Sequence, residues 1–207
     1  MDSRKARAAR ILAALKKLLP KAGMVLKYGN SWELLVAVIL SAQCTDKKVN
    51  EVTTRLFRKY RTLEAYIRAR PRAFEKDIYE TGFYRAKTKN ILAAARMIKE
   101  KFNGKIPRTM EAMVTIPGVG RKTANVVLGN AYGVVEGIAV DTHVLRLARV
   151  LKLSRHTDPV KVERDLMALF LKKDWFRLTY LLIEYGRQYC PARRHDHTKC
   201  PLTKLLE

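Results

Sequence analysis

Apolar residues recur at spacings of three and four along most of this chain, which is typical of helices that bury one face. The stretch 3–19 has this pattern and is followed by a proline, Pro20. A second stretch, from an N-cap at Ser31 to about Cys44, is apolar on all sides and predicts a buried central helix. The same spacing predicts further helices over residues 46–59, 62–69, 71–79, 85–102, 109–114, 121–132, 141–151, 159–171 and 174–187.

Only one short stretch, Val134–Val140, has the composition of a strand. A chain of many short helices is most simply arranged as two helical domains side by side, and a cleft between domains is a common binding site. We therefore predict an all-α fold of two helical domains, with the turn at residues 133–138 as a candidate crossing between them.

Composition and charge narrow the possible functions. Of the 207 residues 48% are hydrophobic, enough for a folded core, while the longest apolar run, Leu34–Leu40, is far short of the roughly 20 residues of a membrane span. The net charge of +23 is spread over the whole sequence and favours a nucleic acid partner, although a basic proteome or a membrane-surface role also gives such a charge. Three cysteines without a signal peptide form no closed disulfide framework and indicate a reduced, cytosolic protein.

The most informative segment, residues 116–125, lies between two predicted helices. Its glycines, Gly118 and Gly120, allow a tight turn whose backbone N–H groups face outward at the positive end of the next helix, an arrangement that binds phosphate. A Pro-Gly-x-Gly turn is equally compatible with an ordinary connection between helices.

Two residues near this turn are candidates for covalent chemistry. Lys122 falls in the first turn of the predicted helix, where the helix dipole and the neighbouring Arg121 favour the free amine that a nucleophile requires. A single lysine on a helix is otherwise simply solvated. Asp141 fits an N-cap of another predicted helix, and a carboxylate held in that way stays ionised and available for catalysis. His143, two residues on, fits a structural role.

Two further segments have the chemistry of base recognition. Gln43 follows the apolar helix and can offer a donor and an acceptor to a base edge, although a surface amide is the plainer interpretation. The turn at residues 81–87 presents aromatic residues beside cations, which suits a wedge in a base stack, although aromatic residues beside a turn commonly belong to a core.

Four segments, in this order and at these separations, resemble the endonuclease III family of helix-hairpin-helix DNA glycosylase/AP lyases. They are Leu40–Gln43, Gly82–Tyr84, Ile116–Asn125 and Ala139–His143, and the resemblance runs from about Ser31 to Pro201. It implies a six-helix barrel at residues 24–134, a second helical domain made of residues 1–23 and 135–207, and an active site in the cleft between them.

The resemblance also implies roles for individual residues. Lys122 would be the nucleophile and Asp141 the essential carboxylate of a bifunctional enzyme that removes oxidised pyrimidines and cuts the strand by β-elimination. Gln43 would fill the space of the flipped nucleotide, and Phe83 would occupy the wedge position, where bacterial members often have leucine. The other positions expected to bind DNA are Asp46, Gly118, Val119, Gly120, Arg121, Arg193 and Arg194.

The chain departs from the family near its C-terminus. Many members hold a four-iron four-sulfur cluster with the pattern Cys-x6-Cys-x2-Cys-x5-Cys, and here only two of the four positions are cysteines. The four positions are Cys190, His197, Cys200 and Leu206. The two cysteines with His195 and His197 are an alternative zinc site, but their spacing fits no common zinc motif well. We therefore expect no metal, and apolar anchoring of the segment by Pro201, Leu202, Leu205 and Leu206.

Two other functions fit the same fold, a monofunctional mismatch glycosylase and a non-catalytic helix-hairpin-helix DNA-binding protein. Intact Lys122 and Asp141 argue against both. We expect a monomer that acts on double-stranded DNA containing damaged pyrimidines or abasic sites, in the cytoplasm at the nucleoid and without a membrane partner.

Overall fold

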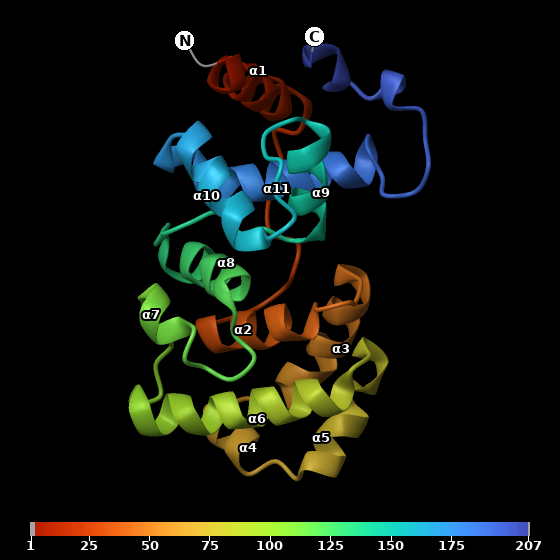
Figure 1. The fold of residues 1–207 in the computed structure, drawn as a ribbon. Coiled ribbons are helices and arrows are strands. Elements are labelled where there is room, and N and C mark those ends of the chain that lie inside the picture. Colours follow the sequence, from red (N-terminus) through yellow and green to blue (C-terminus); the bar gives the residue numbers. More distant parts are fainter. Residues whose placement is uncertain (1–2, 207) are drawn as a thin grey trace. The chain divides into compact units, whose positions relative to one another are not determined.

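The computed structural model describes residues 3–206, and within them it contains helices and turns but no strand (Figure 1). The α-helices are α1 (Ser3–Leu18), α2 (Ser31–Leu40), α3 (Asp46–Lys59), α4 (Leu63–Ile67), α5 (Pro71–Ile78), α6 (Tyr84–Lys101), α7 (Met110–Met113), α8 (Arg121–Tyr132), α9 (Thr142–Val150), α10 (Pro159–Leu169) and α11 (Lys172–Gln188). Short 3₁₀ turns are η1 (Tyr79–Thr81), η2 (His197–Lys199) and η3 (Thr203–Leu205). The predicted all-α class is confirmed for this part of the chain. None of its helices has the length and apolar character needed to cross a membrane.

The described chain divides into two compact units. One consists of residues 25–134 and contains α2 to α8. The other joins residues 3–24 to residues 135–206, so that α1 packs against α10 and α11 from the far end of the sequence.

Helix α2 is the centre of the unit formed by residues 25–134. Its residues 34–40 are all buried, and it packs against α3, α6 and α8. A helix that is apolar on all sides is stable in water only when neighbours cover it on all sides. The all-apolar pattern of this segment therefore correctly predicted a central element.

The other unit has its own core, and α1 supplies one edge of it. Ala8, Ile11 and Leu15 are fully buried along one stripe of α1, in the same apolar cluster as Leu178 and Leu181 of α11. Such a stripe at helical spacing drives the helix onto its neighbours, because it removes apolar surface from water. The N-terminal helix is thereby fixed to the C-terminal third of the chain.

The boundaries of α2 differ from the expectation. Asn30, and not Ser31, is the N-cap, because its side-chain oxygen accepts the N–H of Glu33 at 2.9 Å. The helix ends at Leu40 and not at about Cys44, since the hydroxyl of Ser41 donates to the carbonyl of Val38 at 2.8 Å and the backbone then turns away.

The stretch 134–140, which has the composition of a strand, forms none: these residues are an irregular connection from α8 to α9 without a partner strand in the described chain. Ile138, Ala139 and Val140 are all buried, so consecutive side chains are covered by helices and do not alternate between two faces. The carbonyl of Ala139 accepts the hydroxyl of Thr179 on α11 at 3.0 Å. The apolar run therefore reflects a buried loop.

Candidate nucleic-acid interface and catalytic residues

The turn between α7 and α8 is a hairpin whose tip is exposed and whose apolar side chains are buried in the unit. Ile116 and Val119 are buried, and the N–H of Val119 donates to the carbonyl of Ile116 at 3.0 Å. Gly118 is exposed with φ +80, and a Cβ at this position would lie 2.8 Å from the Cβ of Asn90 on α6. Only glycine fits that conformation and that close approach.

Val119 is one of the hairpin residues expected to bind DNA. Its side chain is 6% exposed, and its N–H is already used within the turn. Val119 therefore anchors the hairpin, while the exposed backbone of Gly118 and Gly120 forms its outer surface.

Helix α8 begins directly behind this hairpin. Gly120 is its N-cap and has no side chain to accept the N–H groups of the first turn. Such N–H groups and the helix dipole favour an anion at this end of the helix. Arg121 and Lys122, the first two residues of α8, lie in this positive region, with Arg121 exposed and Lys122 half-buried.

Asp141 occupies the position expected for it at the start of α9. Its Oδ1 accepts the N–H of Val144 at 2.8 Å, so it is the N-cap of that helix. Each carboxylate oxygen accepts more than one hydrogen bond, so capping leaves acceptor capacity for a ligand. His143, the second residue of α9, lies so close to α11 that a Cβ on Gly186 would be 2.8 Å from its Nδ1, which fits the structural role expected for it.

Gln43 and Phe83 share an unusual backbone conformation. Their φ angles are +52 and +47, in the left-handed region, and both side chains are exposed, Phe83 to 64%. For residues other than glycine this conformation costs about 1–2 kcal/mol and persists where the surrounding structure holds it. Asn103 and Lys152 adopt the same conformation, so what distinguishes Gln43 and Phe83 is the chemistry of their exposed side chains, an amide and an aromatic ring.

Lys87, one of the two cations expected to lie beside the aromatic residues of the 81–87 turn and hold phosphate, is instead buried and binds backbone carbonyls. It is 4% exposed, and its Nζ donates to the carbonyls of Leu40 and Thr81, each at 2.8 Å. Burial lowers the pKa of this ammonium group. One side chain thus ties together the two segments that present Gln43 and Phe83. Its position in the sequence indicates this burial, because Lys87 falls on the same stripe of α6 as Ile91 and Ile98, where an apolar residue is expected.

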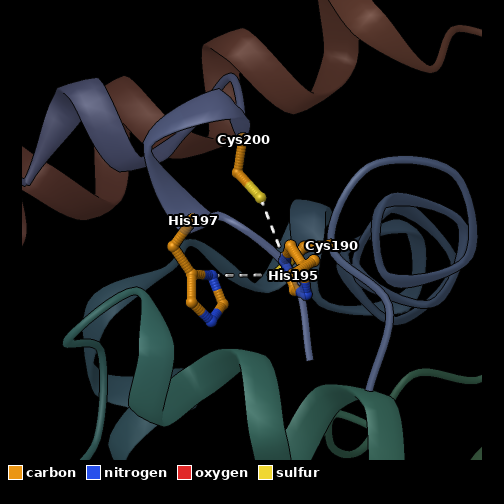
Figure 2. A group of neighbouring side chains, drawn as sticks. All are labelled: Cys190, His195, His197 and Cys200. Atoms are coloured by element: carbon orange, nitrogen blue, oxygen red, sulfur yellow. Dashed lines mark hydrogen bonds between the residues drawn. The ribbon is translucent and has the colours of Figure 1, made fainter. Parts of the chain in front are cut away.

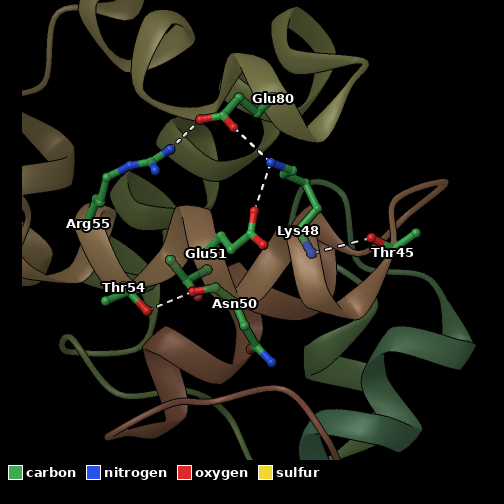
Figure 3. Close-up of polar contacts among 8 residues, drawn as sticks. Thr45, Lys48, Asn50, Glu51, Thr54, Arg55 and Glu80 are labelled. Carbon is green, nitrogen blue, oxygen red and sulfur yellow. Dashed lines mark hydrogen bonds and ion pairs between the residues drawn. The ribbon is translucent and has the colours of Figure 1, made fainter.

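An ion-pair network fixes the turn that precedes Phe83 (Figure 3). Glu80 of η1 forms ion pairs with two residues of α3, Lys48 at 2.9 Å and Arg55. Lys48 also pairs with Glu51 of the same helix at 2.8 Å. These partners hold the pKa of the Glu80 carboxyl below its usual range. The groups are exposed, so the network contributes orientation more than stability.

Asp46 is the first residue of α3 and is half-buried. Thr45 caps this helix, since its hydroxyl oxygen accepts the N–H of Lys48 at 3.3 Å. A carboxylate in the first helical turn is favoured by the helix dipole, so Asp46 has a structural reason for its position independent of DNA.

The segment after α11 brings together four possible metal ligands. The side-chain ligand atoms of Cys190, His195, His197 and Cys200 all lie within 4.8 Å of one another (Figure 2). Arg193 and Arg194, on the same loop, are exposed.

The residues present do not fit a four-iron four-sulfur cluster. The fourth position of the family pattern is Leu206, whose side chain has no donor atom and packs partly buried against the apolar core. The same core holds Leu202, which is fully buried, and Leu205. The expected apolar anchoring by these leucines is therefore confirmed.

Known proteins resemble this chain over nearly its whole length. Residues 36–172 match the family described as HhH-GPD superfamily base excision DNA repair protein. Endonuclease III of Synechocystis sp. is 48% identical over 99% of this chain and 94% of its own length. The solved structure of a non-covalent endonuclease III–DNA complex has a TM-score of 0.93 at 43% identity, covering 97% of this chain and 94% of that one, and a trapped endonuclease III–DNA covalent intermediate gives the same values. By sequence and by fold, the chain belongs to the endonuclease III family of the HhH-GPD superfamily.

Proposed function

We propose that this chain is a bifunctional DNA glycosylase and AP lyase of base excision repair, which removes oxidised pyrimidines from double-stranded DNA and then cuts the strand. The observation that carries the proposal is the position of Lys122 in the first turn of α8, directly behind a glycine hairpin suited to phosphate. Support comes from the trapped covalent intermediate with DNA formed by an endonuclease III that is 43% identical to this chain.

DNA binding comes first in this proposal. The hairpin at Gly118 and Gly120 holds a phosphate, Phe83 enters the base stack, and Gln43 fills the space that the flipped nucleotide leaves. Flipping is necessary because a base inside a duplex is out of reach of any side chain. Arg121, Arg193 and Arg194 contact the DNA backbone, and Asp46 lies at the edge of the lesion pocket.

Chemistry then follows at the sugar. As the N-glycosidic bond breaks, positive charge develops on the sugar, and the carboxylate of Asp141 stabilises it. The amine of Lys122 attacks C1′ while the damaged base leaves with the bonding electrons and takes up a proton, and the ring-opened product is a Schiff base. Loss of a proton from C2′ then expels the 3′ phosphate, and water hydrolyses the Schiff base to release Lys122.

These steps use neither a redox group nor a metal. We propose that the chain carries no four-iron four-sulfur cluster, because His197 and Leu206 stand at two of the four thiolate positions. We further expect the enzyme to act as a monomer on chromosomal DNA at the nucleoid.

The experiment that tests the function is borohydride trapping on duplexes that contain thymine glycol or an abasic site. Borohydride reduces the Schiff base to a stable amine, so the wild-type chain should form a covalent adduct and nick the strand. Lys122→Ala should abolish both, while Lys101→Ala, which changes an exposed lysine at the end of α6, should leave both unchanged.

An undiminished adduct in Lys122→Ala would assign the nucleophile to another amine. Base removal without any adduct in the wild-type chain would favour a monofunctional glycosylase. Lesion binding without base removal would favour a non-catalytic DNA-binding protein.

A further inference from the structure

We propose that Cys190, His195, His197 and Cys200 bind a single zinc ion. Cys190 lies just beyond the end of α11, and the loop that follows returns so that His195, His197 and Cys200 lie beside it (Figure 2). Both cysteines are buried in the apolar core of their unit, whereas His195 is half-buried and His197 is exposed. The four residues close one small site at the edge of a core.

Two sulfur-to-nitrogen distances in the group match the coordination geometry of tetrahedral zinc. Cys190 Sγ lies 3.7 Å from His197 Nδ1, and Cys200 Sγ lies 3.3 Å from His195 Nε2. A tetrahedral zinc with Zn–S of about 2.3 Å and Zn–N of about 2.0 Å has a sulfur-to-nitrogen edge of about 3.6 Å. All four ligand atoms lie within 4.8 Å of one another, so side-chain rotations that bring the remaining pairs closer would complete the coordination.

The orientation of His195 is the one that metal binding requires. Its Nδ1 lies 2.8 Å from the carbonyl oxygen of Arg193, so Nδ1 carries the proton and donates it to that oxygen. The lone pair of Nε2 is then directed toward Cys200. Metal-binding histidines commonly donate their second ring N–H to a carbonyl in this way, which fixes the ring.

A second contact supports the thiolate side of the site. Arg146 of α9 directs Nη1 toward Cys190 Sγ at 3.5 Å and Nη2 toward the carbonyl of the same residue. N–H donation to a coordinated sulfur stabilises its negative charge. On zinc binding each thiol releases one proton, so one Zn²⁺ replaces two protons, and the complex with two neutral imidazoles has no net charge.

The donor set distinguishes zinc from the cluster found in many relatives. Two thiolates and two imidazoles around one point suit zinc, whereas an eight-atom cluster needs four ligands that stand further apart. The spacing of the sequence alone favours no metal here, because it matches no common zinc motif. The positions of the four ligand atoms favour zinc instead.

The site would have a mechanical consequence. The nine residues between Cys190 and Cys200 carry the exposed Arg193 and Arg194. A zinc ion closes this segment into a loop of fixed shape, as a crosslink does, and so limits how far the two arginines move.

The test begins with the untagged full-length chain purified without added metal. Elemental analysis should find about one zinc per chain, with neither iron nor inorganic sulfide. After removal of zinc by a chelator, the melting temperature should fall by about 5 °C or more and should recover on addition of zinc. Cobalt(II) added to the zinc-free chain should give the visible ligand-field bands and sulfur charge-transfer band of a tetrahedral thiolate site, and zinc should displace it.

Variants locate the site. His197→Ala should weaken cobalt binding by at least about tenfold and shift its bands, and because His197 is exposed this change leaves the core intact. Cys190→Ser and Cys200→Ser should abolish the sulfur charge-transfer band. Cys44→Ser and His156→Asn, which remove a cysteine and a histidine outside the site, should leave the spectra unchanged.

Three results would overturn the proposal. One is a freshly purified chain that contains no stoichiometric zinc and gives no tetrahedral cobalt spectrum. Another is iron together with sulfide in the purified chain. The third is a Cys190–Cys200 disulfide, found by thiol counting on the chain purified under reducing conditions. Lesion nicking is not the readout, so failure here leaves the proposed function standing.

Discussion

Two aspartates make the same local contact at the start of a helix, and only one of them is expected to act in chemistry. Asp141 accepts the N–H of Val144 at 2.8 Å, and Asp158 accepts the N–H of Lys161 at 2.9 Å. Asparagine retains the oxygen that caps the helix but has no charge. Asp141→Asn should therefore keep the fold and lesion binding, and lose base removal by on the order of 10²-fold or more, since a neutral amide does not stabilise the sugar cation.

Asp158→Asn is the matched control for that change. It alters the same atoms at the same kind of cap, so it should leave single-turnover base excision near the wild-type rate. Equal excision rates for the two variants, measured on a thymine glycol duplex, would remove Asp141 from the mechanism.

Lys87 illustrates how a single buried residue can position two others. Lys87→Met retains most of the length of the side chain but removes the donor to the carbonyls of Leu40 and Thr81. Two buried acceptors then lack their partner, and the free energy of unfolding should fall by about 1–3 kcal/mol in urea titrations. Lesion affinity should fall as well, because Gln43 and Phe83 follow these carbonyls by three and two residues.

The control is Lys89→Met on the exposed face of the same helix, which should change neither quantity. A purely structural role for Lys87 would lower stability without changing how Phe83 enters DNA. That insertion can be followed by the fluorescence of a base analogue beside the lesion, under conditions where the variant is fully folded. An unchanged signal would restrict Lys87 to stability.

At the scale of an element, the hairpin before α8 depends on one glycine more than on the others. Gly118→Ala combines a left-handed φ with a Cβ only 2.8 Å from Asn90, while Gly133→Ala has a similar φ, +66, with no atom within 4 Å. In either variant, the left-handed conformation alone should lower the free energy of unfolding by about 1 kcal/mol. The Gly118→Ala variant should lose more stability because of the contact with Asn90, and it should also bind DNA more weakly. The Gly133→Ala variant should bind DNA as the wild-type chain does. Equal stability loss in chemical unfolding would show that the contact with Asn90 is easily relieved.

Helices that carry their own boundary signals were predicted well from the sequence. The expected ranges 46–59 and 121–132 coincide with α3 and α8, where Thr45 and Gly120 mark the start and an amphipathic or apolar pattern runs to the end. Asp158 followed by a proline likewise marks the start of α10. Periodicity succeeds in these places because local and tertiary preferences agree.

The features that sequence reasoning missed depend on contacts between distant segments. The apolar run at 134–140 gives the same pattern for a strand and for a buried loop, so only the neighbouring helices decide between them. Lys87 meets carbonyls up to 47 positions away. The four Cys and His side chains meet because the chain turns back after α11, and their spacing alone does not show that turn.

At the scale of the whole molecule, the charge of +23 predicts how binding depends on salt. Each phosphate that the protein neutralises releases counterions, which lowers log K by about 0.9 for each tenfold increase in salt. The 42 lysines and arginines are spread over both units, so only a subset can face one duplex. Some of them, including Lys16, Lys59 and Lys99, are also paired with carboxylates of the protein itself.

We therefore expect a slope of log K against log salt of about −3 to −7 for a lesion duplex, measured by fluorescence anisotropy. An undamaged duplex should give a similar slope at lower affinity, because the phosphate contacts do not depend on the lesion. Removing the charge of Arg193 should make the slope less negative by about 1. Removing the charge of Lys99, which is paired with Glu64, should leave the slope unchanged. A slope near zero would mean that the positive charge serves another partner, and that recognition of DNA rests on the flipped nucleotide alone.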